Sequence, residues 1–131
     1  MQDLHNNIGV ENGFTAAVIN SDTTTAGAII DLDGVQAVEW VMEATAYTDG
    51  TYTPLIEDGE DSGLSDAAAV ADAQLLGTEA GAALAAAGLS RIGYVGGKRY
   101  ARLSWVSTAT TTGATLNATV VTGHYRHAPV A

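Results

Sequence analysis

The amino-acid sequence predicts an all-β fold, a jelly-roll-like sandwich of six to eight short antiparallel strands. Apolar and polar residues alternate with a period of two in several short segments, as they do in strands that bury one face. Turn-forming residues separate these segments at short intervals, which is typical of sandwiches and jelly rolls. The 131 residues suffice for one domain with its own core and no more.

Residues 1–24 are predicted to form an extended N-terminal arm. A single sandwich domain is predicted over residues 25–131, ending in a short C-terminal tail. The first segment is polar, with three successive threonines near its end and only scattered apolar anchors. We expect such a segment either to stay mobile or to become ordered by lying on a neighbouring subunit.

The first strands of the sandwich are predicted between residues 26 and 56. An apolar run covers residues 26–32, and residues 38–47 alternate between apolar and polar side chains with acidic residues on one face only. An Asp-Gly pair follows each of these segments, and this dipeptide favours a tight turn. Residues 51–56 form the next predicted strand, in which Pro54 indicates an edge position or a bulge because proline lacks the backbone N–H.

The middle of the chain has no single pattern. Residues 57–63 are rich in acidic residues and glycine and predict an exposed loop. Residues 66–87 are rich in alanine, which favours a helix, but two glycines interrupt the segment. We expect one short helical turn near residues 66–73, a strand around residues 75–76 and an irregular return.

The C-terminal third predicts strands again, over residues 89–95, 98–107 and 115–122. Gly96-Gly97 separates the first two strands, and we interpret it as a hairpin turn that uses positive φ angles. A phosphate-binding loop is disfavoured because the glycines are too few and no helix is predicted after them.

The charges are divided along the chain. All fifteen acidic residues lie between Asp3 and Glu79, and all five basic residues lie between Arg91 and Arg126. This asymmetry indicates either a surface for a partner or two halves that pair within one fold. We favour the second interpretation because one small domain packs both halves together. The net charge of −10 argues against nucleic-acid binding, which depends on clustered Lys and Arg.

No membrane or export segment is expected. The first twenty residues contain no Lys or Arg, which a signal peptide would carry. The Ala- and Gly-rich run over residues 80–90 is far shorter than the ~20 apolar residues that span a bilayer.

Two acidic segments raise the question of a cation site. Hard cations bind clustered oxygen atoms, and these occur over residues 57–61 and in Asp31-x-Asp33. EF-hand spacing is not met, because position twelve counted from Asp58 is Ala69. We therefore expect a solvated loop and turn, with a weak cation site as the alternative.

The sequence predicts no catalytic centre, metal or cofactor. The absence of cysteine excludes disulfides and thiolate chemistry, and no serine lies in a G-x-S-x-G turn. Glu39 and Glu43 share a strand face and could mimic a glycosidase pair, but on an acidic surface we expect them to be solvating charges. His124 and His127 supply only two of the ligands that zinc needs, and His5 is the only other histidine.

Two segments carry a resemblance to a known group of proteins. Residues 90–103 read Ser-Arg-Ile-Gly-Tyr-Val-Gly-Gly-Lys-Arg-Tyr-Ala-Arg-Leu, and residues 49–59 read Asp-Gly-Thr-Tyr-Thr-Pro-Leu-Ile-Glu-Asp-Gly. Together they resemble small virion proteins of tailed bacteriophages, in which such chains are capsid cement, or decoration, proteins. The resemblance covers roughly residues 35–128.

The resemblance implies a jelly-roll-like domain on the outer surface of an icosahedral phage head. Such proteins bind where major capsid subunits meet, often as dimers or trimers on local symmetry axes, and help the shell to resist the pressure of the packaged DNA. The implied partners are the major capsid protein and further copies of this chain, with no nucleic acid and no membrane. The implied location is the virion surface, after synthesis in the host cytoplasm. The alternatives are a phage tail or fibre component and a carbohydrate-binding jelly-roll module.

The predicted capsid contacts are the apolar anchors of the N-terminal segment and the basic residues after Gly97. An extended arm can reach across a subunit boundary and add a strand to the edge of a neighbour's sheet. The residues are Leu4, Ile8, Val10, Phe14, Lys98, Arg99 and Arg102.

Overall fold

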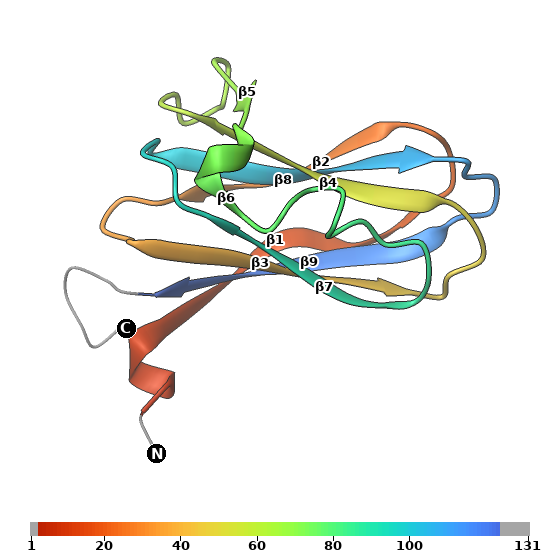
Figure 1. Ribbon diagram of the computed structural model, residues 1–131, viewed down its shortest axis with the longest axis horizontal. Helices are drawn as coiled ribbons and strands as arrows, with labels where there is room; N and C mark the ends of the chain where they lie inside the picture. Colours follow the sequence, from red (N-terminus) through yellow and green to blue (C-terminus); the bar gives the residue numbers. More distant parts are fainter. Residues whose placement is uncertain (1–2, 124–131) are drawn as a thin grey trace.

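A computed structural model describes residues 3–123 and shows two antiparallel β-sheets packed face to face (Figure 1). The strands are β1 (Ile8–Ile19), β2 (Thr24–Asp31), β3 (Ala37–Thr45), β4 (Thr51–Gly59), β5 (Ala68–Ala69), β6 (Leu75–Leu76), β7 (Gly88–Tyr94), β8 (Tyr100–Thr108) and β9 (Ala114–Gly123). The first sheet has the order β1-β9-β3-β7-β6, and the second has the order β2-β8-β4-β5. The predicted all-β sandwich is confirmed.

The strands pair in a nested order that defines a jelly roll. β1 pairs with β9, β2 with β8, β3 with β7 and β4 with β5, all antiparallel. The chain is therefore one long hairpin that is wound into two sheets. β3 also pairs with β9, and β4 with β8, which joins neighbouring pairs within each sheet.

The helical content of the described chain is limited to two single 3₁₀ turns, η1 (His5–Asn7) and η2 (Asp72–Gln74). The predicted helical turn near residues 66–73 is therefore displaced toward its C-terminal end, and the predicted strand at residues 75–76 is β6. Between residues 3 and 123, no helix has the length and the apolar character needed to cross a membrane.

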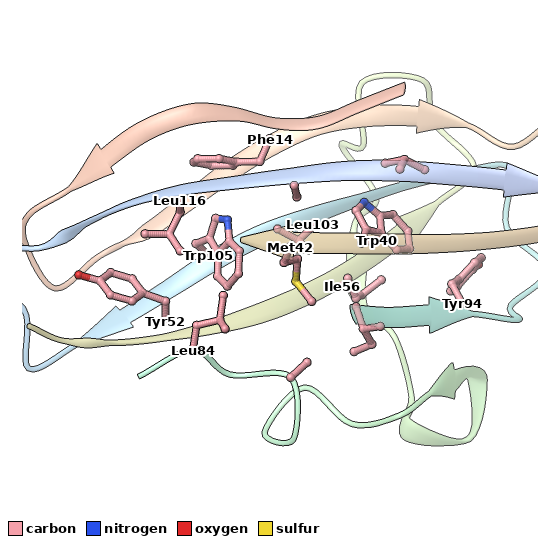
Figure 2. Close-up of a cluster of buried hydrophobic side chains, with 14 of the residues drawn as sticks. Phe14, Trp40, Met42, Tyr52, Ile56, Leu84, Tyr94, Leu103, Trp105 and Leu116 are labelled. Carbon is pink, nitrogen blue, oxygen red and sulfur yellow. The ribbon is translucent and has the colours of Figure 1, made fainter. Parts of the chain in front are cut away.

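The core fills the space between the two sheets. β3 contributes Trp40 and Met42, and β8 contributes Leu103 and Trp105, all fully buried, as Figure 2 shows. These residues occupy alternate positions of their strands, as the period-two pattern predicts. The two buried indole N–H groups have no hydrogen-bond acceptor within the described residues. Each such group costs about 1–3 kcal/mol, so the burial of the two large ring systems has to outweigh that cost.

The predicted N-terminal arm is wrong for residues 8–19, which form β1. This strand pairs with β9 from Ile8 opposite Gly123 to Ile19 opposite Ala114, and the side chain of Phe14 is buried in the core. The register shifts between Asn12 and Phe14, and again before Ala17. These irregularities break the period of two, and the strand is therefore hidden from a pattern analysis.

The predicted hairpin at Gly96-Gly97 is also wrong. β7 belongs to the first sheet and β8 to the second, so the connecting residues cross between the sheets. Neither glycine has a positive φ angle. Residue 96 is a glycine because a larger side chain would not fit: a Cβ atom there would lie 2.3 Å from the hydroxyl oxygen of Tyr94.

Residues 60–87 close one side of the sandwich. Leu84 and Tyr52 exchange two backbone hydrogen bonds of 2.8 and 2.9 Å. Ile56 accepts a backbone hydrogen bond from Val70 at 2.9 Å, and its own N–H donates to the Glu79 carboxylate at 2.8 Å. β5 reaches only Glu57 and Asp58 of β4, so Pro54 lies on an edge position, as its missing N–H predicts.

We predict that Phe14→Ala lowers the free energy of unfolding by about 3–5 kcal/mol, because it removes a buried aromatic side chain and leaves a cavity. Val18→Ala, on the same strand at an exposed position, should change it by no more than about 0.5 kcal/mol. Urea unfolding followed by circular dichroism measures both. Equal unfolding midpoints for Phe14→Ala and the parent chain would show that β1 is a peripheral arm.

Candidate functional site

The basic side chains of the described chain are paired with acidic ones from its first half. Each pair joins atoms within 4.0 Å: Arg91 with Glu39, Lys98 with Glu60, Arg99 with Asp31 and Asp33, and Arg102 with Glu57. The basic residues of the second half therefore pair with acidic residues of the first half within one fold, which is the interpretation that we favour from the sequence. The pairs of Arg91, Lys98 and Arg99 are exposed, and such pairs each contribute about 0–1 kcal/mol, so their main effect is to neutralise local charge.

Arg99 lies beside the Asp31-x-Asp33 turn, which in the sequence is a fragment of a cation-binding pattern. Its guanidinium donates two hydrogen bonds to the Asp31 carboxylate, at 3.1 and 3.0 Å, and lies 3.8 Å from Asp33. The hydrogen bond from Arg99 lowers the pKa of Asp31 and raises that of Arg99. The Asp31-x-Asp33 turn thus already faces a fixed cation.

Arg102 is held on the outer surface of the second sheet. Its Nε donates to the Glu57 carboxylate at 2.8 Å, and the two residues lie opposite each other on β8 and β4. Their side chains are only 23% and 20% exposed. Lys98 and Arg99 are about half exposed, and so they are more accessible to a partner than Arg102 is.

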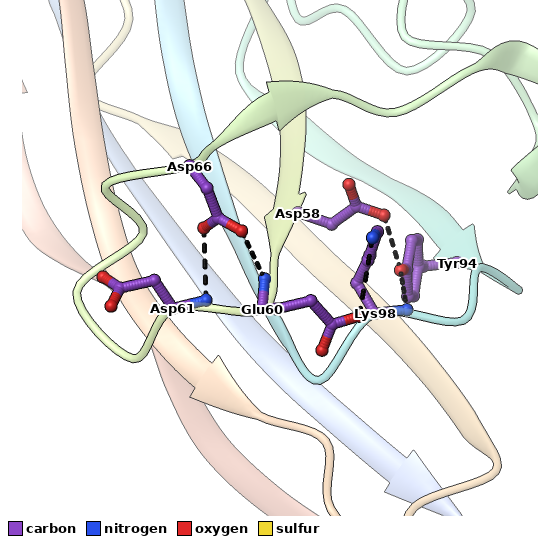
Figure 3. A network of polar contacts seen from close by, with 6 residues as sticks. All are labelled: Asp58, Glu60, Asp61, Asp66, Tyr94 and Lys98. Carbon is purple, nitrogen blue, oxygen red and sulfur yellow. Dashed lines mark hydrogen bonds and ion pairs between the residues drawn. The ribbon is translucent and has the colours of Figure 1, made fainter.

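The acidic loop is folded by its own carboxylates (Figure 3). The Asp66 side chain accepts hydrogen bonds from the backbone N–H groups of Glu60 and Asp61. The Asp61 carboxylate accepts hydrogen bonds from the backbone N–H groups of Gly63 and Ser65. These bonds lower the pKa of both carboxyl groups. No group of three or more His, Asp or Glu residues between 3 and 123 is placed to hold a metal ion.

The start of the predicted loop belongs to a strand, which is a correction to the sequence analysis. Glu57 and Asp58 lie in β4, and Asp58 is buried. The Asp58 carboxylate accepts a 2.7 Å hydrogen bond from the Tyr94 hydroxyl, which itself accepts one from the backbone N–H of Lys98. Burial raises the pKa of Tyr94, and the bond to Asp58 raises it further.

Two neighbouring hollows lie at this end of the sandwich. The larger, of about 460 Å³, is lined by residues 32–38, residues 94–99 and Glu60. Its charged side chains are those already paired with one another. The smaller, of about 230 Å³, lies on the first sheet and is lined mainly by apolar residues, among them Ile8, Leu76 and Val95.

Glu39 and Glu43 lie on the open face of β3 rather than in a cleft that encloses both. Glu39 faces Arg91 on one neighbouring strand, and Glu43 accepts a 3.4 Å hydrogen bond from Asn117 on the other. This arrangement agrees with charges that solvate a sheet face. The interpretation of His124 and His127 concerns residues outside the part of the chain that the structure describes.

The predicted capsid-contact residues do not all lie together in the structure. Leu4 and Val10 are 66% and 63% exposed at the N-terminal end of the first sheet, and Ile8 lines the smaller hollow beside them. Lys98 and Arg99 line the larger hollow at the same end. Phe14 is in the core and Arg102 lies apart on the second sheet, so these two are not part of the group.

The turn between β8 and β9 is held by a carboxylate, the Asp49 clamp, which is not predicted from the sequence. Asp49 accepts hydrogen bonds from the backbone N–H groups of Thr111, Thr112 and Gly113 and from the Thr111 hydroxyl. Asp22 accepts another from the N–H of Thr110 at 2.8 Å. The hydrogen bond from the Thr111 hydroxyl and those from the turn's N–H groups hold the pKa of Asp49 far below its usual value.

Comparisons with protein-family models, with curated proteins and with solved structures found no match to this chain.

We predict that Asp49→Asn lowers the Tm at pH 7 and that this difference from the parent chain narrows in acid. The folded-state pKa of Asp49 lies below the unfolded value, so its stabilisation is complete above about pH 3.9 and is lost as pH falls through the folded pKa. Thermal melts at neutral and strongly acidic pH measure this. Asp72→Asn, at an exposed position in η2, is the matched control. The same loss of Tm at both pH values would mean that the charge of Asp49 does not hold the turn.

Proposed function

We propose that this protein is a non-enzymatic structural protein of a phage virion. In this proposal it binds the outer surface of the icosahedral head where major capsid subunits meet, and stabilises the shell. The observation that carries the proposal is the distribution of exposed apolar side chains. Among residues 3–123, six of the seven large ones lie on or beside strands of the first sheet: Leu4, Val10, Val18, Leu76, Leu89 and Val95. Exposed apolar surface gathered on one side marks an interaction surface.

The second sheet differs from the first in this respect. Its one large exposed apolar side chain in the described chain is Ile29, although each sheet carries an ion pair on its outer surface, Arg102–Glu57 on the second and Arg91–Glu39 on the first. In the proposed arrangement the first sheet lies toward the shell and the second toward solvent.

The resemblance to cement proteins supports the same proposal. Residues 90–103 run from β7 into β8, and residues 49–59 contain β4, which pairs with β8. The two resembling segments are therefore neighbours in the fold. Jelly rolls occur in viral coats and in lectins, so the fold alone does not decide between them.

The aromatic residues give the carbohydrate-binding alternative little support. Sugar sites stack sugars on exposed aromatic rings, whereas Trp40, Tyr52 and Trp105 are fully buried here and Tyr94 is nearly so. Tyr47 and Tyr100 are only partly exposed. A phage tail or fibre component remains an alternative, and copy number separates it from a head protein.

Stabilisation of the shell would follow from binding alone. A protein that binds only the assembled shell shifts the equilibrium toward that state by mass action. Copies that associate on a local symmetry axis grip several capsid subunits together, so weak individual contacts add through effective concentration.

We predict that the purified chain co-sediments with empty phage heads that lack it and saturates at hundreds of copies per particle. The decorated heads should then survive higher temperatures than bare heads, since bound protein stabilises the assembled state. Quantitative gel densitometry of pelleted heads counts the copies, and light scattering during heating follows shell loss. Absence of binding, or saturation at a few copies, would contradict a head-decoration function.

A further inference from the structure

The edge strands on the two sides of the sandwich differ in how far the rest of the chain covers them. On one side, residues 60–87 cover the edges of β4 and β7 through β5, β6 and the backbone bonds of Leu84 and Val70. On the other side, within residues 3–123, β1 pairs only with β9 and β2 pairs only with β8. The backbone N–H and C=O groups on the outer side of an edge strand are free to pair with another chain.

The first part of β1 is the most regular part of this open side. Ile8 to Asn12 pair with β9 without a register shift, and the shifts begin only after Asn12. At Gly13 the strand meets β2 closely: a Cβ atom on Gly27 would lie 2.4 Å from the Gly13 carbonyl oxygen. In Figure 1 the N-terminal half of β1 runs outward beside the end of β9. Ile8–Asn12 contain no lysine, no proline and no register shift, which commonly protect an edge, and their one charged residue is Glu11.

The smaller hollow begins at this edge. Ile8, Gly123 and Ala37 are aligned across β1, β9 and β3, so two of the three positions have little or no side chain. The hollow of about 230 Å³ therefore lies between Ile8 and Val121 on one side and Leu76 and Val95 on the other. Leu76 and Val95 remain 57% and 55% exposed.

The unpaired charge of this edge is acidic. Glu11 is exposed within the open segment, whereas the Glu39 carboxylate in the hollow is already 3.8 Å from Arg91. A second copy of this chain would bring a further net charge of −10 and a second Glu11. A segment that carries Lys or Arg complements the edge better.

We propose that Ile8–Asn12 bind an extended segment of the capsid subunit as an added β-strand. This inference rests on the proposed function and names the part of the capsid that the protein recognises. Main-chain hydrogen bonds to β1 provide the affinity, and an apolar side chain of the segment packs against Ile8 at the rim of the hollow. A Lys or Arg of the same segment lies near Glu11.

The matched variants are Val10→Lys and Ala16→Lys. Both residues are exposed on β1, but only Val10 belongs to the open segment, whereas Ala16 lies between Phe14 and Ala17, where the register with β9 shifts. Lysine on an edge strand opposes pairing with another chain, and it also repels a basic partner. In co-sedimentation with bare heads, Val10→Lys should weaken binding by about tenfold or more, and Ala16→Lys by no more than about twofold. Circular dichroism and thermal melts check that both variants fold.

The outcomes separate this inference from the proposed function. Binding of the parent chain with equal binding of both variants would overturn strand addition and leave the decoration function standing. Failure of the parent chain to bind heads would overturn both.

Hydrogen exchange on the parent chain tests the same point without a substitution. The amides of residues 8–12 that face away from β9 should exchange rapidly in the free chain and slowly on heads. Slow exchange in the free chain at every concentration would show that another part of the chain covers the edge. Slow exchange that depends on concentration would show that a second copy covers it. Either result would overturn the inference.

Discussion

The position of β9 between β1 and β3 is the constraint on which the rest of the sandwich depends. The last strand of the described chain lies between the first and the third, so the first sheet is complete only when distant parts of the chain have come together. Leu116 and Val120 of β9 are fully buried, and Val120 lies opposite Trp40 of β3. Such long-range pairing costs loop-closure entropy and is slow to form. The Asp49 and Asp22 carboxylates hold the turn that leads into β9, so they stabilise the element that the sheet most needs.

The nested pairing also explains why the divided charges meet. A jelly roll places each late strand beside an early one, and this brings β8 next to β2 and β4 and brings β7 next to β3. Arg102 therefore faces Glu57, and Arg91 faces Glu39, although each pair is far apart in the sequence. Pairing neutralises these charges locally but leaves a net charge of −10, which favours a neutral or basic partner.

The sequence predicts the strands whose two faces differ clearly. β3 and β8 alternate between buried and half-buried residues over most of their length, and the period-two pattern finds both. β1 is missed because its register shifts twice, once on each side of Phe14, and these shifts interrupt the period of two before the strand reaches Ile19. The crossing at Gly96-Gly97 is mistaken for a hairpin because the local sequence does not say to which sheet the next strand belongs.

The candidate site is predicted only in part, for a similar reason. Leu4 and Val10 are exposed as a contact residue should be, whereas Phe14 is withdrawn into the core and Arg102 is held by Glu57. The exposure of Leu76 and Val95 depends on the packing of β6 against β7, which no short segment encodes. The Asp49 clamp joins residues more than 60 positions apart, so composition and spacing do not reveal it.

The proposed function and the inferred strand pairing both place the first sheet against another protein. The polar groups of the described chain are largely engaged in holding turns and strands, while six of its seven large exposed apolar side chains lie on or beside that sheet. A cryo-electron microscopy map of phage heads saturated with this protein tests the orientation most directly. The account predicts density for the sandwich on the outer shell surface, with β1 and the first sheet in contact with capsid subunits. A map with the second sheet against the shell, or with density only at the tail, would contradict it.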